Sequence, residues 1–290
     1  MTTRLTAGVA ALMAAVAPLV VVAVGSDALG GAALGGAALR AEAPRRLVIR
    51  PAQTKDWNAS LADVEKVLAS AAGELWRFFP ERDLPPILVE PKGGPIVLFQ
   101  RGANGEYLVR LDTGSTFWCQ YAYQFAHEFC HILCNHKEGD KANKWFEEAL
   151  CELASIFAIR AMARSWAADP PYPNWREFSK SLQKYADDLV QQGQLPQGTT
   201  LPEWLKQHLP EMAQRADIRD RNRVVAVALL PLFEKAPEHW EAVGWLNASD
   251  TGVTRPFALY LADWQAQAPR RHKPFIRDLA QLLGVTLPQR

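Results

Sequence analysis

The sequence has no block or stripe of basic residues, and its 32 Lys and Arg are balanced by 31 Asp and Glu to a net charge of +1. Surfaces that bind nucleic acid normally carry clustered positive charge, so nucleic acid is excluded as an expected partner. What remains is an ordinary globular composition, 49% apolar and 22% charged. The chain of 290 residues is long enough for one large domain or two small ones.

The N-terminal segment has no charge between Leu5 and Val24 and no cysteine near its end. Arg4, this apolar run and the following small residues predict a secretory signal over residues 1–28, with a Gly/Ala-rich linker over residues 29–44. The missing cysteine argues against a lipoprotein. An uncleaved membrane anchor is the alternative, because about 20 apolar residues can span a bilayer. In both cases the remainder is exported, to the periplasm, the cell envelope or the outside.

The rest of the chain has no internal repeat and changes its hydrophobic period along its length. Apolar residues at helical spacing predict a helix from Leu61 to Leu75, and short apolar runs then predict strands up to about Thr113, the last two joined at Asn104-Gly105. Helical patterns follow almost to the end. We therefore expect an α+β fold, with a mixed domain over residues 45–168 and a helical domain over residues 169–290.

The stretch "FAHEFCHILC" contains His127-Glu128-Phe129-Cys130-His131, an H-E-x-x-H pattern. Residues four apart share a helix face, so both imidazoles can bind one Zn²⁺ at about 2.0–2.1 Å. Glu128 lies about 100° around the helix, where it can reach a metal-bound water without being a ligand. By chance this pattern is expected in roughly one such chain in a hundred, so its context must supply a third ligand.

In metzincins the third ligand is a His or Asp six residues after the second motif histidine, with a Gly at the third residue. Here Lys137 and Cys134 stand at those two positions, so this pattern does not apply. His136 would lie about 500° around a continued helix from His131, off the ligand face. The following segment, "WFEEALCELAS", offers three carboxylates, at Glu147, Glu148 and Glu152.

An H-E-x-x-H helix followed by a helix that bears a glutamate resembles the gluzincins, the clan of thermolysin and the aminopeptidase N-like enzymes. "WFEEA" is similar to the opening of their second helix, with Glu147 where Asn is usual. The resemblance covers about residues 108–158 and implies a zincin-like layout of N-terminal helix, small sheet, motif helix and glutamate helix. It implies that Glu148 is the third zinc ligand and that Glu152 orients a zinc-bound imidazole.

Helix geometry leads to the same assignment. If the two helices run antiparallel, the end of the first faces the start of the second, which brings Glu148 to His131. Glu152, one turn on, would lie beside His127, and Glu147 would point away by about 100°.

The function expected from these residues is that of an exported zinc metallopeptidase acting on a peptide or protein, with Zn²⁺ held by His127, His131 and Glu148. A zinc-bound water would attack the peptide bond, with Glu128 as general base. The resemblance also places an extended substrate along an edge strand, for which "EYLVRLDTG" is the candidate beside its interpretation as an ordinary hairpin strand. A non-catalytic zinc-binding envelope protein on the same scaffold is the alternative function.

Four cysteines complete the candidate residues: Cys119, Cys130, Cys134 and Cys151. An even number in an exported chain is typical of disulfides, and one bridge could join the two ligand helices. A structural zinc site that uses Cys130 and Cys134, or buried free thiols, are the alternatives.

Overall fold

The computed structural model describes residues 47–137, 140–248 and 253–288. The expected signal segment and linker, residues 1–44, lie outside these described residues. Within them, no helix combines the length and apolar character needed to cross a membrane.

A four-stranded mixed sheet lies in the first part of the described chain, in the order β1-β2-β4-β3. Its strands are β1 (Ile49–Pro51), β2 (Ile87–Pro91), β3 (Ile96–Arg101) and β4 (Tyr107–Leu111). β1 and β4 both pair in parallel with β2, and β3 pairs antiparallel with β4. The hairpin expected at Asn104-Gly105 is confirmed, because β3 and β4 join there and Gly105 has a positive φ of 82°.

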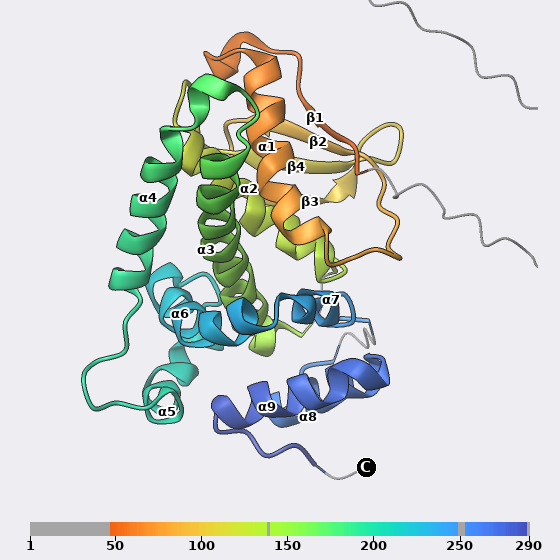
Figure 1. Ribbon diagram of the computed structural model, residues 1–290. Coiled ribbons are helices and arrows are strands. Elements are labelled where there is room, and N and C mark those ends of the chain that lie inside the picture. The colour runs from red at the N-terminus through yellow and green to blue at the C-terminus, as the bar shows by residue number, and fades with distance from the viewer. Residues whose placement is uncertain (1–46, 138–139, 249–252, 289–290) are drawn as a thin grey trace, which may run out of the picture. The chain divides into compact units, whose positions relative to one another are not determined.

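Three helices form the core beside this sheet: α1 (Leu61–Trp76), α2 (Trp118–Leu133) and α3 (Lys144–Ala168). α1 packs against β1 and α2, and α2 and α3 pack side by side, as Figure 1 shows. Buried apolar residues of α2 and α3 belong to one core cluster. Helix α3 is buried on nearly all sides because α1, α2, α4 and α6 surround it. A helix that is apolar all round is typical of a central position in a core.

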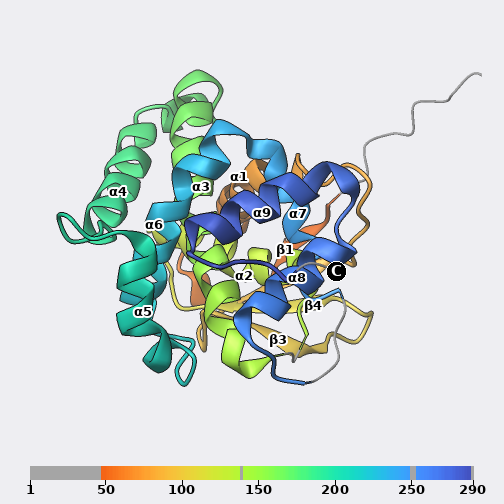
Figure 2. The ribbon, with the colours of Figure 1, turned by 90° about the horizontal axis from the view of Figure 1, so that it is seen from below.

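The described chain after Pro170 contains helices and no strand, as the sequence predicts. The helices are α4 (Phe178–Gln192), α5 (Leu201–Met212), α6 (Arg219–Lys235), α7 (Trp240–Val243), α8 (Phe257–Gln267) and α9 (Lys273–Leu282). Across the described chain, short 3-10 helices occur at Lys55–Trp57, Lys141–Asn143, Pro173–Trp175, Pro237–His239 and Arg270–His272. α8 and α9 lie side by side, as Figures 1 and 2 show.

Contacts group residues 43–290 into one compact unit. The last strand ends at Leu111 and the described chain is helical from Trp118 onward, so the boundary expected between residues 168 and 169 falls at the end of α3, inside this unit. α4 and α6 pack directly on α3. The helical part therefore reaches the glutamates that α3 carries, and the α+β class expected from the sequence is confirmed.

Candidate metal centre

Helix α2 carries His127, Glu128 and His131 on its buried side. The segment forms a helix because its apolar residues recur at three- and four-residue spacing, and none of its residues from Trp118 to Leu133 is Gly or Pro. The side chains of His127 and His131 are 12% and 8% exposed, and Glu128 is 3% exposed. The two imidazole rings are 5.1 Å apart between centroids, so they face the same region.

Glu148 of α3 points its carboxylate at both imidazoles. Its Oε2 atom lies 3.1 Å from Nε2 of His127 and 3.5 Å from Nε2 of His131. Ligand atoms held at about 2.0–2.1 Å from a tetrahedral zinc are about 3.3–3.4 Å from one another. The two separations from Glu148 are close to this value, so Glu148 lies where a third ligand would be expected from either imidazole. One sulfur, that of Cys151, also lies within 4.8 Å of a ring nitrogen of each histidine.

The charge of the site also fits a dication. Glu128, Glu147 and Glu148 bring three carboxylates into a largely buried region, and Lys144 supplies one positive charge close by. Buried carboxylates require compensating charge, because desolvation of an unpaired ion is costly. A Zn²⁺ ion would offset the remaining negative charge.

The acid–base state of the site follows from the same neighbours. Burial and Lys144 oppose a charged His131, but Glu148 and Glu147 raise its pKa to about 10. Burial likewise opposes a charged Glu147, but Lys144 and His131 lower its pKa to about 2. The pKa of Glu148 is also far below its usual range, because the two histidines outweigh its desolvation. A metal ligand must be a neutral imidazole, so a bound ion would replace a proton here.

Glu147 holds His131 in place. Its Oε1 lies 2.6 Å from Nδ1 of His131 and accepts from Lys144 Nζ at 2.6 Å, and its Oε2 accepts from Asn247 Nδ2 at 2.9 Å. Tyr260 of α8 in turn donates to Asn247 Oδ1 at 2.9 Å. A carboxylate on the outer nitrogen fixes the tautomer and direction of a metal-binding histidine. The expectation that Glu147 points away from the site is therefore wrong.

We predict that Glu147→Ala lowers zinc affinity by roughly 10–100-fold, the usual cost of losing a carboxylate behind a ligand histidine. Competition with a chromophoric chelator measures this affinity. The matched control is Glu177→Ala, since the Glu177 side chain is 78% exposed and pairs only with Lys180 among the ion pairs of the described residues. Equal zinc affinity in the two variants would contradict the role given to Glu147.

Glu152 lies elsewhere than expected. Its Oε2 accepts a short hydrogen bond from the Tyr123 hydroxyl, and its Oε1 accepts from Arg223 Nε of α6 at 2.8 Å. In the antiparallel helix pair, Glu152 therefore lies one turn beyond His127, beside Tyr123. The expectation that Glu152 orients a zinc-binding imidazole is replaced by a buried ion pair that joins α3 to α6.

This ion pair makes a prediction about stability. Glu152 is fully buried and Arg223 is 8% exposed, so Glu152→Ala leaves a buried guanidinium with only a long 3.5 Å ion pair to Asp220, whose side chain is 94% exposed. We expect a loss of about 3–5 kcal/mol in the free energy of unfolding, measured by urea denaturation. The double variant Glu152→Leu/Arg223→Met removes both charges and should recover much of the loss. An unchanged denaturation midpoint in Glu152→Ala would contradict this account.

A pocket of about 330 Å³ opens over the three candidate ligands. β3 with the residue before it forms one part of the lining, and the start of α6 with a residue just before it forms another. The lining side chains are Pro95, Ile96, Val97, Phe99, His127, Glu128, His131, His136, Lys144, Glu148, Glu152, Asp217, Arg219 and Asn222. A neighbouring hollow of about 390 Å³ shares Phe99 and Lys144 with it, so the two are adjacent.

The edge of the sheet at this pocket is β3, which pairs only with β4 among the described strands. β4 lies inside the sheet between β2 and β3, so its backbone has no free side for another chain. The expectation that "EYLVRLDTG" supplies the edge strand is therefore wrong, and its alternative, an ordinary hairpin strand, is confirmed. Ile96 and Phe99 of β3 are 43% and 52% exposed, and both line the pocket.

His136 lines the pocket although the helical projection placed it off the ligand face. Helix α2 ends at Leu133, and positive φ angles of 72° at Asn135 and 30° at His136 turn the chain back. The His136 ring stacks on Phe99 at 4.6 Å, and its Nε2 is buried with no hydrogen-bond partner in the described part of the chain. Burial lowers its pKa to about 4, so the imidazole is neutral at pH 7.

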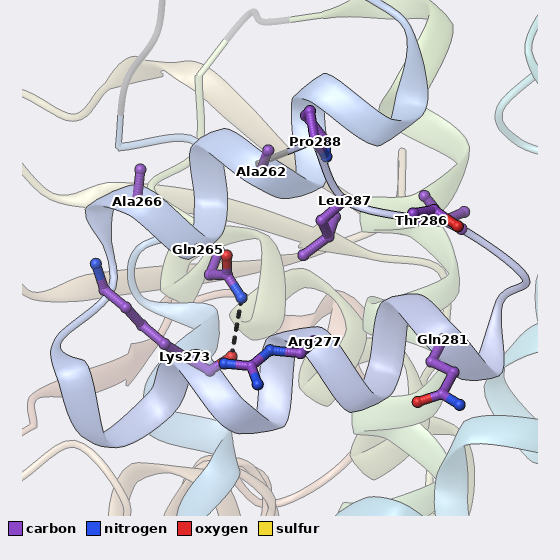
Figure 3. A pocket seen from close by; sticks show the side chains of 10 residues that line it. Ala262, Gln265, Ala266, Lys273, Arg277, Gln281, Thr286, Leu287 and Pro288 are labelled. Atoms are coloured by element: carbon purple, nitrogen blue, oxygen red, sulfur yellow. Dashed lines mark hydrogen bonds between the residues drawn. The ribbon is translucent and has the colours of Figure 1, made fainter. Parts of the chain in front are cut away.

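Another hollow, of about 850 Å³, lies between α8, α9 and the C-terminal segment, away from the motif (Figure 3). Gln265 donates to the Lys273 carbonyl oxygen there at 3.1 Å, and Arg277 and Thr286 face the same space. Its described lining has no acid, histidine or cysteine. Its described lining therefore offers none of the side chains that usually hold zinc.

Comparison with known protein families, with curated proteins and with solved structures gives no match to this chain.

Proposed function

We propose that this protein is an exported zinc-dependent peptidase of the gluzincin type that hydrolyses peptide bonds. The observation that carries the proposal is the approach of Glu148 Oε2 to Nε2 of both motif histidines, at 3.1 and 3.5 Å. Glu128 lines the same pocket. These four side chains are the set that a catalytic zinc site of this type requires, three ligands and one general base.

The arrangement of the elements supports a zincin-like layout. The mixed sheet, the motif helix α2 and the glutamate helix α3 follow one another in the chain, and the edge strand β3 borders the pocket. When bound, Zn²⁺ would lower the pKa of a coordinated water toward about 7 and polarise a carbonyl group.

Glu128 supplies the acid–base chemistry. It would take a proton from the attacking water and deliver it to the leaving nitrogen, which requires a carboxylate that can reach both atoms. Meanwhile Glu147 keeps the imidazole of His131 directed at the metal position.

The substrate is proposed to be an extended peptide that adds to β3. The free side of this edge strand can form main-chain hydrogen bonds with a peptide, and Ile96 and Phe99 offer apolar contacts. Hydrolysis also needs a donor to the oxyanion, and four tyrosines and histidines of the helical part are not among the described residues that line the pocket: Tyr172, Tyr185, His208 and His239. Lining side chains that can donate a hydrogen bond are the better candidates, among them His136, Lys144 and Arg219.

Hydrolysis of an unfolded protein by the purified chain tests the proposal. Chelator-treated protein should be inactive, and one equivalent of Zn²⁺ should restore cleavage, detected by mass spectrometry of the new peptide ends. Zinc bound at one equivalent without cleavage of any substrate tried would favour the alternative, a non-catalytic zinc-binding envelope protein.

A further inference from the structure

A cluster of three thiols lies next to the candidate zinc site. It consists of Cys130 and Cys134 from α2 and Cys151 from α3, and their sulfur atoms all lie within 4.8 Å of one another. All three residues are fully buried. The fourth cysteine, Cys119, is only partly buried and lies three turns earlier on α2, outside the cluster.

The geometry of the cluster suits a metal ion. A metal–sulfur bond of about 2.3 Å places three sulfurs around one ion about 4 Å apart when the ion lies in their plane. The upper bound of 4.8 Å on the sulfur separations allows this after a small inward movement of the side chains. Cys130 and Cys134 are four apart on one helix face, so both thiols point toward α3 without any change in the backbone.

The number of thiols distinguishes metal binding from a disulfide. A disulfide would join two of the three cysteines and leave the third as a buried thiol, whereas one metal ion uses all three. The structure has all of them as free thiols. Cys130 Sγ also lies 3.7 Å from the carbonyl oxygen of Leu150, a long contact for a weak donor.

The chemistry of the ligands selects the ion. Thiolates are soft ligands that favour Cu⁺ over the hard cations, and no fourth sulfur lies with these three in the described part of the chain. Zinc in structural sites normally takes four ligands, so a three-thiol set suits it less well. The sulfur of Cys151 also lies within 4.8 Å of ring nitrogens of His127 and His131, so the cluster and the zinc site are neighbours.

We propose that Cys130, Cys134 and Cys151 form a second metal site, which binds one Cu⁺ ion through three sulfur ligands. The thiols release their protons to solvent as the ion binds, and no electron is transferred. A bound ion would link α2 and α3, the two helices that carry the zinc ligands, because its own ligands come from both.

Copper binding to the purified protein, with zinc first supplied at one equivalent, tests this site. Cu⁺ is added without oxygen in competition with a chromophoric Cu⁺ chelator, and X-ray absorption at the copper edge reports the ligands. We expect one copper per chain with three sulfur neighbours near 2.3 Å. This readout needs no variant, so it holds even if a cysteine variant fails to fold.

Variants locate the site. Cys134→Ser and Cys151→Ser should each lower Cu⁺ affinity on the order of 100-fold or more, because each removes a direct ligand. Cys119→Ser is the matched control and should bind copper as the unaltered protein does. Glu148→Ala should also keep copper, which separates this site from the proposed zinc site. Copper retained after both cluster substitutions, nitrogen or oxygen neighbours in the absorption spectrum, or a disulfide between two of these cysteines would overturn the proposal.

Discussion

Replacing Glu148 by alanine should lower zinc affinity on the order of 10³-fold or more, well beyond the roughly 10–100-fold expected when a residue behind a ligand is lost. The reason is geometric. Glu148 Oε2 is the one carboxylate oxygen found within 3.5 Å of Nε2 of both His127 and His131 among the ion pairs of the described residues. Without it, two imidazoles remain, and two nitrogen ligands hold zinc weakly. Zinc affinity is measured by chelator competition followed by metal analysis.

Two variants on the same helix serve as controls for Glu148→Ala. Glu147→Ala should fall between it and the unaltered protein, because Glu147 contacts His131 from behind. Glu152→Gln should bind zinc almost normally, since Glu152 pairs with Tyr123 and Arg223. Zinc retained in Glu148→Ala and lost in Glu152→Gln would show that the wrong carboxylate has been assigned.

The second large effect concerns turnover. Glu128→Gln should lower kcat by about 10²–10⁴-fold, the usual contribution of a general base. The substitution keeps the size of the side chain and removes its ability to take a proton. Since Glu128 is not among the three proposed ligands, zinc content should stay at one per chain. KM for a peptide substrate should change little, because binding along β3 does not require this carboxylate.

Turnover, zinc content and the unfolding midpoint of Glu128→Gln together show whether Glu128 is a general base or a zinc ligand. Loss of turnover with normal zinc content and an unchanged unfolding midpoint indicates a catalytic role. Loss of zinc together with turnover would indicate that Glu128 is a ligand. Turnover equal to that of the unaltered protein would rule out Glu128 as the general base.

Much of the fold was predictable because its local signals agree with its tertiary structure. The hairpin between β3 and β4 follows from Asn104-Gly105, where a tight turn requires positive φ. The start of α3 beside the end of α2 follows from the short connection between them. His127, His131 and Glu148 meet as the sequence indicates, because spacing along two antiparallel helices is sufficient to bring them together.

The residues behind the ligands were not predictable, since their partners come from distant parts of the chain. Glu147 would point away from the site only if α3 had a single buried face. α3 is instead surrounded by other helices, so residues 100° apart on it can both be buried in the site. Arg223 and Asn247 lie 71 and 100 residues from the glutamates that they bind, and no local pattern connects them.

A different cause explains why β3, and not the expected strand β4, borders the pocket. The order of strands in the sheet is not the order in the chain, because β4 inserts between β2 and β3. The strand nearest to the motif in sequence is therefore an inner strand. His136 lies in the pocket, against the expectation from a continued helix, because α2 ends at Leu133 and the chain turns back through two left-handed residues. One signal was available, since Asn135 is among the residues that tolerate this conformation best.

The central claim is that one zinc ion binds between His127, His131 and Glu148. Anomalous scattering at the zinc edge from crystals of the zinc-loaded protein tests it most directly. The account predicts a single strong peak about 2.0–2.1 Å from Nε2 of each histidine and at a similar distance from a carboxylate oxygen of Glu148. A strong zinc peak at the three thiols or elsewhere, with these three side chains left without an ion, would contradict it.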